Sequence, residues 1–230
     1  MPKRAYGGTR ETARQQHSRR CFSVATITSP TASVAGRSYA VHNRSGMNIG
    51  FSHQLAAMAD LPELKTLMTA SISALIGAYL DPARTEASLD IMGVDTQLIE
   101  DGTYFVAEAE GRIAGCGGWS RRATLFGGDH STGRSVRLLD PGTEPARVRA
   151  MYTHPDFVRR GVGRLVLSLC EEAAAREGFR SLALVATVAG EPLYSACGFS
   201  LVERIDVPTT KGVTIPCARM TKPIADIRFA

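Results

Sequence analysis

Residues 149–164 read Arg149-Ala-Met-Tyr-Thr-His-Pro-Asp-Phe-Val-Arg-Arg-Gly-Val-Gly-Arg164, and the chain continues as Leu165-Val-Leu-Ser-Leu-Cys-Glu-Glu-Ala-Ala-Ala-Arg-Glu177. Residues 148–153 are predicted to form a strand, which Pro155 stops because proline has no backbone N–H to donate. Beyond the turn, apolar residues recur at helical spacing from Val162 onward. The run therefore predicts a strand, a basic glycine turn and a helix that opens near Gly161.

The turn has the properties of an anion-binding site. Gly161 and Gly163 let the backbone approach a ligand, and the first-turn N–H groups of a helix have no partner within the helix. Arg159, Arg160 and Arg164 add positive charge to the partly positive helix end. We therefore expect the turn to hold a diphosphate.

Three ligand classes use such a turn, and two fit the sequence poorly. A P-loop requires a Gly-Lys-Ser/Thr end, which this turn lacks. A dinucleotide fold requires a third glycine and an acid at the end of the next strand. Val166 stands at that glycine position, and residues 182–186 end without an acid. A dinucleotide oxidoreductase is thus disfavoured, and tight NADH binding without CoA binding would revive it.

The third class is indicated by two motifs together. Arg-Arg-Gly-Val-Gly-Arg follows a strand ending in His154-Pro155, and Tyr194-Ser-Ala-Cys-Gly-Phe199 lies downstream. This combination resembles the GCN5-related N-acetyltransferase family, over roughly residues 47–222. One departure is that Val158 occupies the position where the family motif usually has Gln or Arg, with the arginine displaced to Arg159.

The resemblance implies a fold and a set of site residues. The expected fold is α/β, with a mixed, mostly antiparallel sheet of about six or seven strands flanked by helices. The expected cosubstrate is acetyl-CoA, without a metal, and Tyr194 is expected to protonate the departing thiolate. Backbone N–H groups around Met151 to Thr153 are expected to stabilise the oxyanion, which makes Thr153 a second catalytic candidate. The remaining cofactor-binding candidates are Met151, Tyr152, Thr153, Arg159, Arg160, Gly161, Val162, Gly163, Arg164 and Thr187.

The acceptor is expected to be an amine of a small molecule or peptide, acetylated directly in a ternary complex. In the family, helices such as those expected to begin at Asp60 and Asp81 wall the acceptor site. Tyr104, Glu108 and Tyr152 are further residues that could line it. A general base is not identified, because His154 before a proline is more often a turn residue. Thr187 stands where many relatives carry Asn, so a catalytically inactive acyl-CoA-binding or regulatory module stays an alternative.

Charge and cysteine usage bound the remaining possibilities. Residues 1–46 hold eight Lys or Arg against one acid, a net of +7, so the rest of the chain carries −2 of the total +5. Nucleic-acid binding by the folded part is therefore not expected, and no apolar run approaches the span of a bilayer. The five cysteines are odd in number and form no C-x-x-C pair, which argues against a disulfide framework or a zinc site.

The chain is expected to form one domain. Residues 1–46 are predicted to be a disordered basic tail, residues 47–222 the acetyltransferase domain and residues 223–230 a C-terminal tail. The basic tail has two readings, an organellar transit peptide with a processing site near Arg20 or an upstream extension before Met47. We expect a cytoplasmic protein on the second reading and a mitochondrial matrix protein on the first. Many members of the family form homodimers, and no stretch of this sequence identifies an interface.

Overall fold

The structure is a computed structural model, and it describes residues 39–42, 48–131 and 133–225. The strands in chain order are β1 (Tyr39–His42), β2 (Asn48–Leu55), β3 (Tyr104–Ala109), β4 (Arg112–Ser120), β5 (Ala146–Thr153), β6 (Ser181–Thr187), β7 (Ser200–Pro208) and β8 (Thr214–Pro223). The α-helices are α1 (Leu61–Ser71), α2 (Pro82–Ala87), α3 (Thr96–Glu100), α4 (Val162–Arg176) and α5 (Glu191–Ala196). Shorter helical turns are η1 (Met58–Asp60), η2 (Ile72–Ile76), η3 (Ser88–Asp90) and η4 (Pro155–Phe157).

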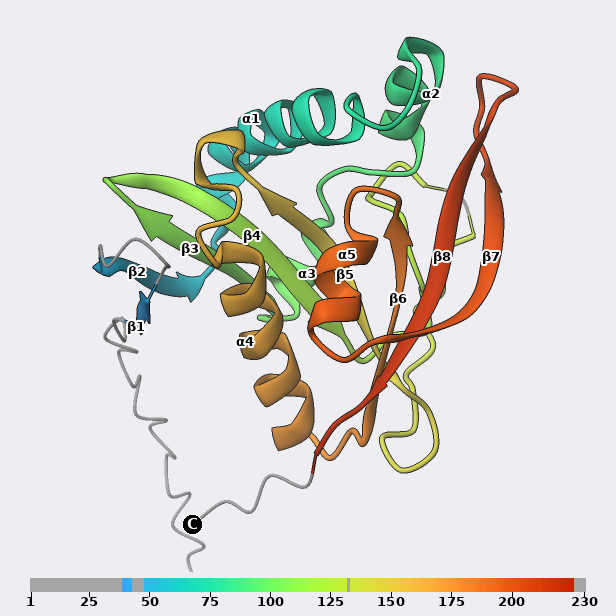
Figure 1. The fold of residues 1–230 in the computed structure, drawn as a ribbon. Coiled ribbons are helices and arrows are strands. Elements are labelled where there is room, and N and C mark those ends of the chain that lie inside the picture. Colours follow the sequence, from blue (N-terminus) through green and yellow to red (C-terminus); the bar gives the residue numbers. More distant parts are fainter. Residues whose placement is uncertain (1–38, 43–47, 132, 226–230) are drawn as a thin grey trace, which may run out of the picture. The chain divides into compact units, whose positions relative to one another are not determined.

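All eight strands belong to one sheet, in the order β1-β2-β3-β4-β5-β6-β8-β7 (Figure 1). The pair β5–β6 is parallel, and the other neighbouring strands are antiparallel. Strands β2–β8 are the seven that the predicted domain supplies, so the predicted mixed, mostly antiparallel sheet is confirmed. Strand β1 is an additional one and comes from the segment predicted to be a tail. The rest of the predicted tail, residues 1–38 and 43–46, lies outside the described residues, as do Met47 and residues 226–230.

Helices cover both faces of the sheet because each strand alternates its side chains between two cores. On one face, the apolar stripe of α4 packs over β3, β4 and β5, and the core there includes Val148, Leu165 and Trp119. On the other face, α1 packs against β4 and β5, and Leu64 and Leu67 belong to the core there. Trp119 is 2% exposed and meets Phe179 edge-on at 5.8 Å, so it is a core residue.

Glycines in β4 allow this close packing. A Cβ on Gly115 would lie 2.4 Å from Val162 Cγ1, the first residue of α4. A Cβ on Gly118 would lie 2.7 Å from the Tyr104 ring. Gly115 therefore lets the start of α4 lie directly on the sheet, whereas Gly118 makes room for Tyr104 in the core of the other face.

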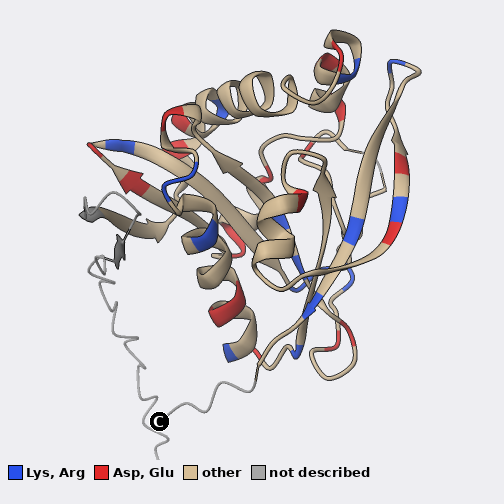
Figure 2. Cartoon of the chain, viewed as in Figure 1, with Lys and Arg blue, Asp and Glu red and all other residues tan. Residues whose placement is uncertain are grey.

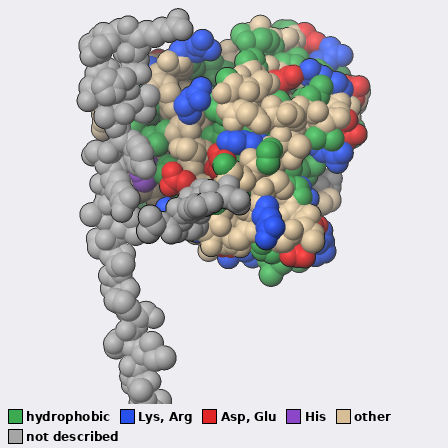
Figure 3. Space-filling model, turned by 60° about the horizontal axis from the view of Figure 1, so that its bottom comes forward, with side chains coloured by type: hydrophobic (Ala, Val, Ile, Leu, Met, Phe, Trp, Pro, Cys, Tyr) green, Lys and Arg blue, Asp and Glu red, His purple; other side chains and the backbone are tan. Residues whose placement is uncertain are grey.

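The described part of the chain has no helix long and apolar enough to cross a membrane. On the face drawn in Figure 3, the basic side chains of the described residues are interspersed with acidic and apolar ones. Four cysteines, Cys116, Cys170, Cys197 and Cys217, are free thiols. Cys21 falls outside the described residues.

Candidate active site

Strands β5 and β6 diverge in the middle of the sheet. Their parallel pairing is limited to Ala146 with Leu182 and Arg147 with Ala183, although both strands continue for several residues. Beyond that point, residues 148–152 of β5 and Val185 and Thr187 of β6 line a cavity of about 670 Å³, including its open mouth. The sheet thus opens a slot between two strands, and their backbones there do not use each other's hydrogen-bonding groups.

A β-bulge shapes the β5 wall of this slot. Gly118 pairs with Arg149 and Cys116 pairs with Tyr152, so Gly117 alone faces both Ala150 and Met151. Ala150 has a φ of +50°, which is rare for a residue with a Cβ. The extra residue of a bulge leaves the ladder and redirects the backbone around it. A Cβ on Gly117 would lie 2.1 Å from Met151 Sδ, so this glycine makes room for the displaced side chain.

The Tyr104 side chain contacts the bulge through a hydrogen bond to its backbone. Its side chain is 1% exposed, and its hydroxyl donates to the Ala150 carbonyl at 2.9 Å and lies 3.1 Å from Cys116 Sγ. Burial raises the pKa of Tyr104 well above its ordinary value, so the hydroxyl keeps its proton and remains a donor. Tyr104 is therefore a support for the cavity wall rather than a part of its lining, contrary to one sequence-based possibility.

The turn before α4 leaves several backbone donors open. Arg159 has a φ of +64° and Gly161 has a φ of +95°, and α4 begins at Val162. The first intrahelical donor is Leu165, which bonds the Gly161 carbonyl at 3.0 Å. The N–H groups of the three residues 162–164 thus have no intrahelical partner and form the positive end of the helix.

The two turn glycines have different structural reasons. Gly161 is needed for its left-handed backbone. Gly163 is needed for packing, because a Cβ there would lie 2.7 Å from Leu193 Cδ2 of α5 and 3.7 Å from Thr153 Oγ1. The sequence reasoning assigned both glycines to ligand approach and missed this contact. Thr153 ends β5 close to the start of α4 and does not belong to the cavity lining.

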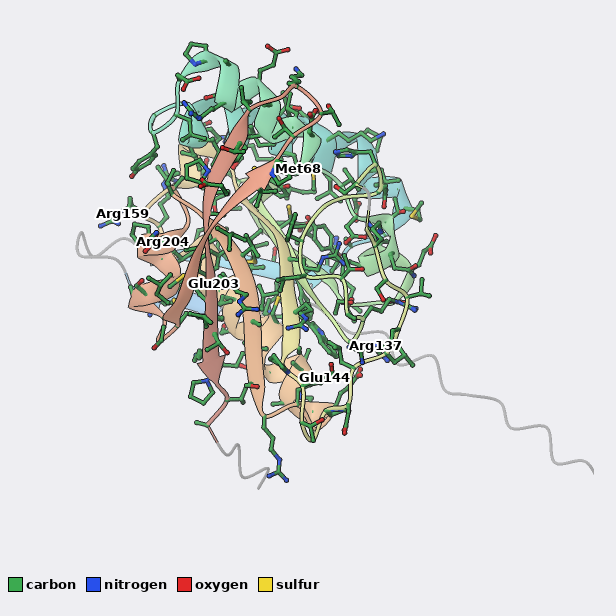
Figure 4. The ribbon with its side chains drawn as sticks, turned by 90° about the vertical axis from the view of Figure 1, so that its right-hand side faces the viewer. Met68, Arg137, Glu144, Arg159, Glu203 and Arg204 are labelled. Atoms are coloured by element: carbon green, nitrogen blue, oxygen red, sulfur yellow. The ribbon has the colours of Figure 1, made fainter. Side chains whose placement is uncertain are left out.

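The turn and the first turn of α4 are rich in arginine (Figure 2), but the three side chains are not equivalent. Arg160 is committed to other groups, because its Nη1 lies 3.2 Å from Glu110 Oε1 and its guanidinium stacks over Phe157 at 5.1 Å. Arg159 is exposed and projects away from the sheet (Figure 4). Arg164 is exposed on the first turn of the helix. Arg159 and Arg164 are thus more available to an anion than Arg160.

Tyr194 of α5 lines the cavity from the other side. It is 7% exposed and packs edge-on against Phe199 with ring centroids 5.8 Å apart. Burial raises its pKa above the ordinary value near 10, so its hydroxyl is a proton donor at neutral pH. Thr187, at the end of β6, lines the same cavity. The structure thus brings Tyr194 and Thr187 together with Met151 and Tyr152 of the bulged strand.

Two other sequence candidates have structural partners elsewhere. His154 caps η4, where its Nδ1 accepts the Asp156 N–H at 3.2 Å, as expected for a turn residue. Glu108 contacts Gln54 Nε2 at 3.1 Å across the β2–β3 pair and does not line the cavity. Neither residue lies on the cavity wall.

Tyr152 closes one end of the cavity. It is 5% exposed, and its hydroxyl accepts the Gly93 N–H at 2.9 Å. The segment that follows η3 is thereby fastened to β5, and Ile91 and Met92 line the cavity beside it. The sequence analysis expected the helices beginning at Asp60 and Asp81 to wall the acceptor site. In the structure, the residues that reach the cavity from this region are 91–93, which follow η3.

A buried ion-pair cluster was missed by sequence reasoning. Arg149 of β5 lines the cavity, and its Nη2 lies 2.5 Å from Asp95 Oδ2 and donates to the Gly127 carbonyl at 2.7 Å. Asp95 Oδ1 accepts from Arg134 Nη2 at 2.7 Å. The long connection over residues 121–145 is thus tied to both β5 and the start of α3. Asp95, Arg134 and Arg149 are too far apart in sequence for a local pattern to predict that they meet.

The described residues include no group of three or more His, Cys, Asp or Glu side chains placed to hold a metal ion. The cavity lining likewise contains no Asp, Glu or His among the described residues. Chemically, the site combines open backbone donors, a protonated phenol and a buried cation in a slot lined by both polar and apolar groups.

Comparisons with known proteins agree with this geometry. Residues 100–201 match the model of the acetyltransferase (GNAT) domain. No curated protein matches the sequence. A GCN5-related N-acetyltransferase from Rhodopseudomonas palustris is similar in structure, with 20% identity, a TM-score of 0.55 and coverage of 74% of this chain and 94% of the other.

Two further solved structures are similar at lower identity. The PaiA N-acetyltransferase of Thermoplasma acidophilum, solved with coenzyme A, has 13% identity, a TM-score of 0.51 and coverage of 75% and 98%. The putative acetyltransferase YncA of Salmonella typhimurium, solved with acetyl-CoA, has 16% identity, a TM-score of 0.51 and coverage of 78% and 97%. At these identities the likeness is one of fold.

Proposed function

Because residues 100–201 match the model of the acetyltransferase (GNAT) domain, we propose that this protein transfers acetyl from acetyl-CoA directly to an amine of a small molecule or peptide. The observation that supports this most is the slot between β5 and β6. Its β5 wall is bulged at Ala150 and ends, through a short turn, at the open first turn of α4. One continuous segment can therefore hold a diphosphate at one end and a thioester at the other.

The described residues fit acetyl-CoA. The N–H groups of Val162, Gly163 and Arg164 would bind the diphosphate, with Arg159 and Arg164 adding charge. Gly161 gives the left-handed backbone that presents these donors. The apolar slot beside Met151 would take the acyl end.

Bound acetyl-CoA supplies an activated thioester. The amine nitrogen bonds to the carbonyl carbon, the C–S bond breaks, and the amine loses a proton. Backbone N–H groups released from the ladder around Met151 would stabilise the negative charge on the carbonyl oxygen. Tyr194 would give its phenolic proton to the departing thiolate. Burial raises the pKa of Tyr194, so the phenol carries its proton when acetyl-CoA binds.

The acceptor must lose its proton without an obvious base, since the described cavity lining holds no carboxylate or imidazole. The slot favours the neutral form of an amine, because burial and the positive charge of Arg149 on its wall both penalise the charged form. The same observation supports a second candidate, an acyl-CoA-binding module without turnover.

Two measurements on the full chain test the proposal. Calorimetric titration with acetyl-CoA should show binding, while NADH should not bind. Thiol release should then be measured with a panel of amines for the unaltered chain and for Tyr194→Phe, with Tyr79→Phe as control because Tyr79 is 62% exposed.

We expect Tyr194→Phe to lower kcat by about 100-fold, as for loss of a general acid, with acetyl-CoA affinity kept. Unchanged turnover would remove Tyr194 from the reaction. Acetyl-CoA binding without thiol release for any amine would favour the non-catalytic module.

A further inference from the structure

Arg149 is a buried cation on the cavity wall, and one of its hydrogen-bond donors has no partner among the described residues. Its side chain is 2% exposed. The contacts to Gly127 and Asp95 both use Nη2, and Nε has no hydrogen-bond partner in the described part of the chain. A buried guanidinium N–H without a partner is costly, so the described residues leave the hydrogen-bonding capacity of Arg149 incomplete, although Nε itself has almost no accessible surface.

The charges around Arg149 leave an excess of positive charge. Asp95 is fully buried and is shared between Arg149 and Arg134. Asp129 approaches Arg134 only to 3.7 Å, its side chain is 43% exposed, and its Oδ1 also accepts the Thr96 N–H. One buried acid thus faces two arginines, and Asp129 offsets that excess only weakly because it is screened by solvent.

The cavity lining also includes apolar side chains. They come from three separate segments, namely Ile91, Met92, Leu125, Phe126 and Val207. The described lining contains no acid that could pair with a cationic group. A polyamine, or a lysine in a basic protein segment, would therefore find no acidic partner in the described lining. An organic anion could pair with Arg149.

We propose that this end of the cavity binds its ligand through a carboxylate held by Arg149, so that the acceptor is a small amine carrying a carboxylate and an apolar group. The amine part rests on the proposed function, and the carboxylate site does not. Arginine suits this role because its planar guanidinium matches the geometry of a carboxylate and keeps its charge when buried.

A matched pair of probes tests the carboxylate site on the unaltered full chain. Calorimetric titrations with 3-phenylpropionate and 3-phenylpropanamide, both with saturating CoA present, compare ligands of nearly equal shape that differ in charge. We expect the acid to bind at least about tenfold more tightly than the amide, as for a charge-assisted pair in a buried site. Equal affinities, or no binding of either probe at millimolar concentration, would overturn the proposal.

Variants of Arg149 test whether the preference for the acid over the amide depends on this side chain. Arg149→Lys keeps the charge but loses the planar fork, and should reduce the preference for the acid several-fold. Arg149→Met should abolish it. Arg137→Met is the matched control, because Arg137 is 58% exposed and pairs with Glu144 in the same connection (Figure 4). A preference that is unchanged in folded Arg149→Lys would exclude Arg149 as the anchor.

Each sample is also titrated with acetyl-CoA. A chain that prefers the acid through Arg149 but does not bind acetyl-CoA would refute the proposed function and keep this inference. The reverse result would keep the function and refute the carboxylate site. The probe comparison on the unaltered chain needs no variant, so the test does not depend on whether Arg149→Met folds with Asp95 left beside one arginine.

Discussion

Replacing Tyr104 with phenylalanine removes one hydroxyl from beneath the bulge in β5. In the structure, this hydroxyl is the donor to the Ala150 carbonyl, at 2.9 Å in a partly buried environment. Without it the carbonyl loses that partner, which costs about 0.5–1.5 kcal/mol. For a domain of this size we expect the melting temperature to fall by about 2–4 °C for each kcal/mol.

The same change should slow acetyl transfer more than it weakens cosubstrate binding. The left-handed residue Ala150 is no longer held, so the backbone donors around Met151 lose their fixed position. A small misplacement of groups at a reacting centre costs up to about 100-fold in rate. The proposed diphosphate site lies at the start of α4, beyond the turn, and acetyl-CoA affinity should change little.

Thermal unfolding, calorimetry with acetyl-CoA and initial rates of thiol release measure the three effects of Tyr104→Phe separately. Tyr79→Phe is the control, since it removes the same atom from an exposed side chain. A Tyr104→Phe protein with unchanged melting temperature and unchanged rate would refute the claim that this hydroxyl fixes the bulge. A lower melting temperature with an unchanged rate would refute only the link between the bulge and catalysis.

Three further outcomes follow from the structure. Arg164→Met should weaken acetyl-CoA binding by about 2–5-fold, whereas Arg160→Met, whose guanidinium is paired with Glu110, should change it less; titration calorimetry that ranks them in the opposite order contradicts the assignment. Gly115→Ala should destabilise the fold by about 1–3 kcal/mol because its Cβ would overlap Val162, whereas Gly50→Ala, with no atom within 4 Å of the added Cβ, should not; denaturant unfolding measures both. The rate should rise with pH as the acceptor amine loses its proton and show no falling limb below about pH 10, because burial raises the pKa of Tyr194 and the protonated acid persists; a tyrosine-dependent decline near pH 8 would contradict this.

The local parts of the fold were predictable because their signals lie in neighbouring residues. Pro155 stops β5, Gly161 permits the left-handed turn, and the apolar stripe of α4 follows at helical spacing. The next strand, expected to include residues 182–186, is β6 at Ser181–Thr187.

The features that shape the cavity were not predictable from one sequence. Ala150 carries no sign of a positive φ, because alanine normally avoids that region and adopts it here only under tertiary constraint. The pairing of Arg149 with Asp95 joins residues 54 positions apart, and no periodicity reports such a contact. The short parallel pairing of β5 with β6 is likewise a property of the assembled sheet.

That short pairing also bears on how the folded chain opens. The parallel ladder between β5 and β6 consists of two residue pairs, and it joins the part of the sheet that ends in β5 to the part that begins with β6. The other contacts between these two parts are hydrophobic ones in the core under α4. Sub-global opening should therefore separate these two parts before either one unravels, so amides of β5 beyond Arg147 should exchange with solvent deuterium earlier than those of β4. A ligand that binds between β5 and β6 would contact both strands, stabilise the closed state and slow that exchange.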